Sequence, residues 1–155
     1  MKKINWCKKQ KTGIRIQEPN DNVSQEYYKN AEESVKVLRT IKETKSNMWL
    51  ATTKYYIEYF AVYSVLMKIG IKCEIHDCTI ALIKFLEDQD VVKKGTSKIL
   101  EDDKELRIEN QYYLKNKTVN INFEKLSSFM LSIKDSLEKL RPDKIRELRE
   151  KIKKL

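Results

Sequence analysis

The sequence predicts an all-α protein, an antiparallel up-and-down bundle of five helices with an N-terminal arm and a short C-terminal helix. With three glycines and two prolines in 155 residues, the chain has too few turn formers for a β protein. Charged residues make up 35% of it, which suits helices that expose one face to water. We therefore expect one domain in three parts: the arm at residues 1–21, the bundle at residues 22–140 and a C-terminal amphipathic helix at residues 141–155.

The bundle is expected to be organised around the aromatic stretch at residues 49–86. Its first part, residues 49–69, contains only three charges, Lys54, Glu58 and Lys68, which fall on one narrow wet stripe of a helix. The rest of the circumference is mostly apolar or aromatic, more surface than one neighbouring helix covers. This pattern predicts a central helix, or one that also faces a second subunit. The embedded charges and the tyrosines argue against a membrane span.

The positions of the other helices are predicted from the spacing of apolar residues and from residues that typically end a helix. A first helix is expected before the central one, over residues 22–42. Gly70 is a typical helix stop, and helical spacing resumes near His76, so the central helix and its successor form an αα-hairpin. A fourth helix with a thin apolar face follows Gly95, and a fifth is expected over residues 123–137.

The C-terminal helix is expected to start afresh at Pro142. Its apolar residues recur at heptad-like spacing. Three roles remain open for it: packing on its own bundle, pairing with a second copy, or lying along an acidic partner.

The N-terminal arm is expected to lack a helix, because lysines are frequent there and apolar periodicity is missing. Trp6 together with Ile14 or Ile16 is expected to pin the arm to the bundle, because an exposed tryptophan on a free tail has no stabilising role.

Positive charge is concentrated in the two ends of the chain. The net charge is +9, of which residues 1–20 carry +5 and residues 134–155 carry +4, so that the middle is neutral. Such ends can bind a phosphate backbone in a salt-dependent way and without sequence preference. The alternative is solvated lysine-rich termini, in keeping with a lysine, glutamate and isoleucine bias like that of heat-adapted proteins.

The three cysteines are expected to be free thiols in a reducing cytoplasm, because their number is odd and no signal peptide precedes them. Cys73 and Cys78, five residues apart on or near a helix, are expected to lie beyond bridging distance unless the connection folds back. A zinc site of Cys73, His76, Cys78 and Cys7 is an alternative, but this spacing matches none of the usual zinc patterns. We therefore expect neither a metal nor a cofactor, and interpret His76 as a capping or interface residue.

No catalytic motif is present, so chemistry has to be argued from single residues. Arg107 lies on the thin face of the fourth helix with Tyr112 and Tyr113 shortly after it. A guanidinium and two phenols could hold a phosphate or stack on a base. The alternative is a packed ion pair of Arg107 with Asp103 or Glu105.

The hairpin resembles a known signature. The stretch WLATTKYYIEYFAVYSVLMKIGIKCEIHDCTIAL is similar to the signature hairpin of the HEPN superfamily, and most similar to its small single-domain archaeal and bacterial branch. The resemblance extends over roughly residues 4–140, and it is carried by the Tyr55-Tyr56 pair, Phe60, Ala61, the turn from Leu66 to Gly70, and His76.

The resemblance implies a nucleotide- or RNA-binding domain. HEPN ribonucleases carry an arginine followed, a little over one helical turn later, by a histidine, and two copies meet at a dimer interface. Here Arg107 is present, but Tyr112 and Tyr113 stand where that histidine would be, and tyrosine is a poor general base. The resemblance thus implies a cytoplasmic homodimer with a non-catalytic or degenerate site, binding through Arg107, Tyr112, Tyr113 and His76. It also implies a minimal nucleotidyltransferase as a partner in a toxin–antitoxin pair.

Two other functions stay open. The first is a metal-independent ribonuclease with Arg107, and with Tyr112 or with His76 as an unusual second residue. The role of His76 requires that folding or dimerisation bring it beside Arg107. The second is a non-enzymatic assembly module that binds protein through the aromatic hairpin and residues 141–155.

Overall fold

The computed structural model describes residues 4–155 and confirms the all-α class. Six helices have eight or more residues and one is shorter, while strand structure is limited to one two-stranded sheet. In chain order, the elements are α1 Ile4–Lys9, β1 Arg15–Ile16, α2 Asp21–Ile41, the 3-10 turn η1 Lys42–Thr44, α3 Asn47–Ile69, β2 Ile71–Lys72, α4 His76–Asp88, α5 Thr96–Gln111, α6 Phe123–Lys139 and α7 Pro142–Lys154.

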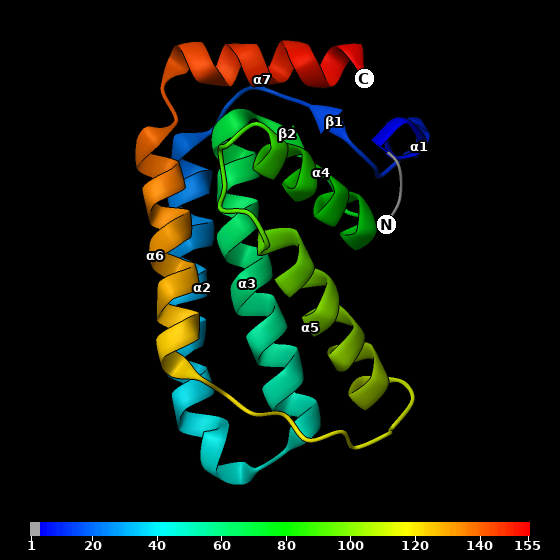
Figure 1. Ribbon diagram of the computed structural model, residues 1–155, viewed down its shortest axis with the longest axis vertical. Helices are drawn as coiled ribbons and strands as arrows, with labels where there is room; N and C mark the ends of the chain where they lie inside the picture. Colours follow the sequence, from blue (N-terminus) through cyan, green and yellow to red (C-terminus); the bar gives the residue numbers. More distant parts are fainter. Residues whose placement is uncertain (1–3) are drawn as a thin grey trace.

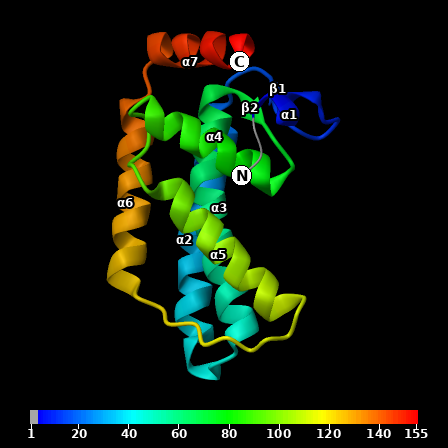
Figure 2. The ribbon, with the colours of Figure 1, turned by 45° about the vertical axis from the view of Figure 1, so that its right-hand side comes forward.

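Helix α3 is the central helix that its sequence predicts. Figures 1 and 2 show α2, α3 and α6 along the long axis, with α5 inclined beside α3. Helices α2, α5, α6 and α7 all pack on α3. Because α4 and α5 are inclined and α7 lies crosswise over one end, the arrangement departs from a regular up-and-down bundle (Figure 1).

The prediction that Lys54, Glu58 and Lys68 form a solvent-exposed stripe on α3 is wrong for Glu58, the middle residue of the three. Glu58 is only 1% exposed, because α5 and α6 cover this part of the helix. Lys54 and Lys68 keep 21% and 25% of their side-chain surface exposed. A helix with so little exposed surface needs partners on nearly every side, which is why α3 sits at the centre.

The C-terminal end of α3 is closed by segments from both ends of the chain. Gly70 ends the helix in a left-handed conformation with φ of 85°, as the sequence predicts. Arg149 of α7 donates hydrogen bonds to the carbonyls of Ile69 at 3.1 Å and of Gly70 at 3.2 Å. Leu148 and Ile152 are fully buried, so α7 packs on its own bundle, the first of the three roles considered for it.

The N-terminal segment is folded, which corrects the expectation of an arm without a helix. Residues 4–9 form α1, and β1 pairs antiparallel with β2, with Arg15 opposite Lys72 and Ile16 opposite Ile71. Ile14 is buried as expected, while Trp6 remains 41% exposed. A six-residue helix is too short to be stable alone, so tertiary contacts stabilise it.

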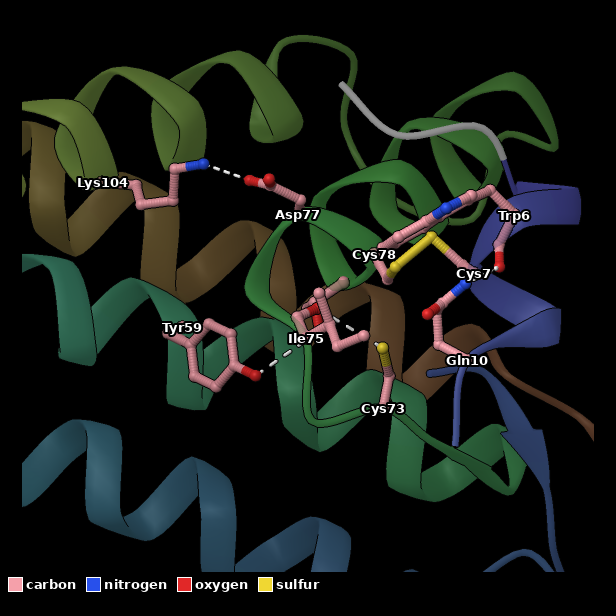
Figure 3. Close-up of a disulfide and its surroundings, with 10 residues drawn as sticks. Trp6, Cys7, Gln10, Tyr59, Cys73, Ile75, Asp77, Cys78 and Lys104 are labelled. Carbon is pink, nitrogen blue, oxygen red and sulfur yellow. Dashed lines mark hydrogen bonds and ion pairs between the residues drawn. A yellow bond between two sulfur atoms is a disulfide. The ribbon is translucent and has the colours of Figure 1, made fainter. Parts of the chain in front are cut away.

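A disulfide between Cys7 of α1 and Cys78 of α4 corrects the expectation of three free thiols. Figure 3 shows this bond joining the N-terminal segment to the first turn of α4. Both cysteines have no exposed surface, and Cys73, also buried, is the free thiol. The sequence pattern missed the pair because the partners are 71 residues apart.

None of the helices within residues 4–155 is both long and apolar enough to cross a membrane.

We expect reduction of the disulfide to destabilise the fold by roughly 4 kcal/mol, because a cross-link over this separation restricts the unfolded chain. The measurement is urea unfolding with and without dithiothreitol. The C7S/C78S double variant should match the reduced protein and should not respond to the reductant. A titration that finds three free thiols in the unreduced, denatured protein would contradict the assignment.

Candidate functional site

Five polar side chains from three helices meet in one cluster. Helix α3 contributes Tyr55, Tyr56 and Tyr59, which lie within about one turn of each other. His76 is the first residue of α4, and Arg107 comes from α5. We call these five residues the Arg107–His76 cluster. It exists because α4 and α5 pack together and α5 packs on α3.

His76 is held by two tyrosines. Its Nδ1 lies 2.6 Å from the Tyr55 hydroxyl, and its ring stacks on the Tyr59 ring at a centroid distance of 4.4 Å. Burial lowers the pKa of His76, and the positive charges of Arg107 and Lys104 lower it further, while Asp77 acts in the opposite direction. The imidazole is therefore neutral at neutral pH.

The direction of the hydrogen bond between Tyr55 and His76 decides which imidazole nitrogen carries the proton. Burial raises the pKa of the Tyr55 hydroxyl, so this group keeps its proton. When it donates to Nδ1 of His76, the imidazole proton sits on Nε2. In this tautomer, His76 offers one N–H donor to a ligand.

Arg107 is buried without a carboxylate partner. Only 9% of its surface is exposed, and its guanidinium carbon lies 4.8 Å from the Tyr55 ring centroid and 5.5 Å from that of Tyr56. One nitrogen, Nη1, lies 3.4 Å from the Tyr56 hydroxyl. Throughout residues 4–155, no carboxylate forms an ion pair with Arg107, and its buried Nε has no hydrogen-bond partner.

The ion pair considered for Arg107 in the sequence does not form. Asp103 pairs with Lys54, and Glu105 is exposed. A guanidinium removed from water without a counterion is costly, and only part of that cost is offset by the rings beneath it. An anion placed against this group would supply the missing partner.

Tyr112 and Tyr113 lie outside the cluster. They follow the last turn of α5 and are 65% and 69% exposed. Tyr113 has the Lys115 ammonium 5.9 Å from its ring centroid, and the ring contacts of Arg107 are with Tyr55 and Tyr56 instead. The sequence signal that was missed is the spacing of the tyrosines on α3, which puts their rings on the side where α5 packs.

The zinc site considered in the sequence, with Cys7 and Cys78 among its ligands, is excluded because these two cysteines are not free thiols. Cys7 and Cys78 are bonded to each other, so neither is available as a thiolate ligand. In the described part of the chain, no group of three His, Cys, Asp or Glu side chains has an arrangement that could hold a metal ion.

The basic C-terminal helix shows the surface expected of a solvated helix. Several of its cations pair with acids about one turn away on the same helix, among them Arg146 with Asp143, Lys151 with Glu147, and Lys153 with Glu150. These pairs favour the solvated-terminus interpretation for residues 142–154 over a dedicated phosphate-backbone site.

No family model, no curated protein and no solved structure matches this chain.

We expect the pKa of His76 to lie below its usual value of about 6.5. It is the single histidine of the chain, so its NMR signal can be followed without ambiguity through a pH titration. The R107M variant removes a positive charge and should raise the pKa. A titration at or above about 6.5 in the parent protein would contradict the burial and charge described here.

The same shift links stability to pH. Because the folded pKa is the lower one, the unfolded chain takes up its proton first as the pH falls. The free energy of unfolding should therefore decrease below about pH 6.5, by at most about 1.4 kcal/mol per pH unit from this residue. Urea unfolding of the parent and of H76Q at several pH values measures the difference in slope.

Proposed function

We propose that this protein binds a nucleotide or RNA through a phosphate group at the Arg107–His76 cluster. The observation that carries the proposal is the buried Arg107 guanidinium, which has no carboxylate partner in the described chain. A phosphate is the common biological anion that accepts several parallel N–H donors from arginine. When Tyr55 donates to Nδ1 of His76, the Nε2–H of His76 is a second donor in the same cluster.

The tyrosines suit the same ligand. Tyr55 and Tyr56 hold the guanidinium against their ring faces, and Tyr59 fixes the His76 plane by stacking. Donors fixed in this way lose little side-chain entropy when a ligand arrives. A neutral His76 also adds no charge that would have to be desolvated.

The HEPN resemblance extends the proposal. We place the chain as a HEPN-like domain that forms a homodimer and binds without cleaving. A minimal nucleotidyltransferase is the partner proposed for it, in a toxin–antitoxin pair. Support for this part comes from the hairpin residues quoted above and from their position at the centre of the fold, where they build both the core and the cluster.

A metal-independent ribonuclease is the second candidate, and the composition of the cluster favours it. His76 and Arg107 share Tyr55 and Tyr56 as neighbours, so the single histidine lies in the same cluster as the arginine. Cleavage requires His76 to accept the proton of a ribose 2′-hydroxyl. That step needs the other tautomer, in which Nδ1–H donates to the Tyr55 oxygen and Nε2 is free.

The assembly-module alternative has less support. The two fully buried apolar side chains of α7, Leu148 and Ile152, are covered by this chain itself. They are therefore not available for a protein partner while α7 stays docked.

We expect R107A to weaken binding of a labelled structured RNA at least about tenfold, because a charged hydrogen bond and its ion pair are lost. Filter binding across a salt series measures this. R146A is the matched control, since Arg146 is an exposed arginine on α7 and should change affinity little. Equal loss in both variants would indicate a nonspecific electrostatic contact and would contradict the proposed site.

The same incubation distinguishes binding from cleavage. With metal stripped from the sample, the first proposal predicts intact RNA in the bound state. Cleavage that disappears in both R107A and H76Q would establish the ribonuclease instead. If the parent protein neither binds nor cleaves the RNA, both candidates are overturned.

A further inference from the structure

A second polar site lies where α3, α5 and α6 meet. A pocket of about 460 Å³ opens there, lined on one side by the apolar side chains of Ile99, Leu126 and Phe129. The polar lining includes Lys54, Glu58, Asp102, Asp103, Asn120 and Lys125. A volume of this size suits a small organic molecule.

Glu58 is the buried polar group of this pocket. It is 1% exposed, and one of its oxygens, Oε1, accepts a hydrogen bond from the Lys54 ammonium at 3.1 Å. The other oxygen, Oε2, is buried and has no hydrogen-bond partner anywhere in residues 4–155. Burial raises the pKa of Glu58 well above its usual value, while Lys54 lowers it. In its ionised form the carboxylate only accepts, so Oε2 then needs a donor that the described residues do not supply.

When Glu58 and Asp103 are both ionised, the charges around Glu58 leave an excess of negative charge. Lys54 is shared between Glu58 and Asp103, so one ammonium balances two carboxyl groups. Asp102 is paired with Lys98 on the surface of α5. The floor of the pocket is thus short of positive charge, although the whole protein carries a net charge of +9.

Lys125 is the other cation of the lining, and it lies on an exposed part of the first turn of α6. It forms no ion pair with a carboxylate of the described chain. Its position lets the sign of the ligand charge be tested directly, because a cation and an anion respond to the loss of Lys125 in opposite ways.

We propose that this pocket binds a small organic amine, whose ammonium donates to Oε2 of Glu58 and whose hydrocarbon body lies against Leu126, Phe129 and Ile99. The ammonium supplies the missing donor, and its positive charge favours the ionised form of Glu58. The apolar wall accounts for the choice of an organic cation over an inorganic one, since it offers no oxygen ligands. The site is independent of Arg107 and of the proposed nucleotide or RNA binding.

Benzylamine is the probe, and benzyl alcohol is its uncharged counterpart of nearly the same shape. Isothermal titration calorimetry should detect benzylamine binding to the full chain and at least about tenfold weaker binding of the alcohol. E58Q keeps the size of the side chain and removes the charge, and it should weaken benzylamine binding about tenfold or more. Thermal unfolding of E58Q shows whether the variant is folded.

Substitutions at two exposed residues of the lining test the proposal without changing the core. K125M should tighten benzylamine binding about twofold to threefold, because a repulsive charge is removed from the lining. N120D adds a negative charge to the lining and should act in the same direction. K134M is the matched control for K125M, because Lys134 is an exposed lysine on α6 outside the pocket lining and should leave the affinity unchanged.

Three results would overturn the proposal. Absence of benzylamine binding removes the site, and equal affinity for the alcohol reduces it to an apolar cavity. Weaker binding in K125M would show that the pocket prefers an anion. R107A distinguishes the two sites of this protein, since it should lose RNA affinity while keeping benzylamine affinity.

Discussion

The burial of α3 is the constraint on which the rest of the structure depends. This helix is apolar or aromatic around most of its circumference, so neighbours must cover it on almost every side. Covering it also obliges its polar groups to find partners inside the protein. The Tyr63 hydroxyl donates to the Cys73 carbonyl at 2.9 Å and accepts from the Cys73 N–H at 3.0 Å, and Tyr55 meets His76. These bonds hold the start of α4 against α3, and so the position of His76 follows from the core.

The end of α3 explains why both chain termini belong to the fold. The last turn of a helix leaves carbonyls without partners. Here the backbone N–H of Gln17 donates to the Gly70 carbonyl at 2.9 Å and that of Asn20 to the Met67 carbonyl at 3.0 Å, both from the segment before α2. Arg149 of α7 completes the set from the other end of the chain. The N-terminal segment and α7 therefore both donate hydrogen bonds to carbonyls at the same end of α3. Each of them is part of the packed domain.

Covering α3 also buries two charged groups at different places along the α3–α5 interface. Within residues 4–155, Arg107 has cation–π contacts and no carboxylate partner. Glu58 shares the Lys54 ammonium with Asp103, and its Oε2 has no hydrogen-bond partner among the same residues. Neither arrangement is the most stable way to fill a core, because well-packed apolar side chains would avoid the cost of desolvation. Buried charges with incomplete partners are typical of binding sites, where a ligand completes them. Their opposite signs are the reason for proposing an anion at one site and a cation at the other.

The sequence by itself determined the six longer helices and the central place of α3, but not α1, because apolar spacing, Gly70 and Pro142 act through neighbours along the chain. It also indicated Arg107 and His76 as residues of interest, although nothing in their spacing showed that they meet. Only the tertiary structure decided that the partners of Arg107 are Tyr55 and Tyr56, that Cys7 joins Cys78, and that Glu58 is buried. Each of these depends on contacts between residues that are distant in the chain. Such contacts are fixed by how the helices pack, and a local pattern carries no information about them.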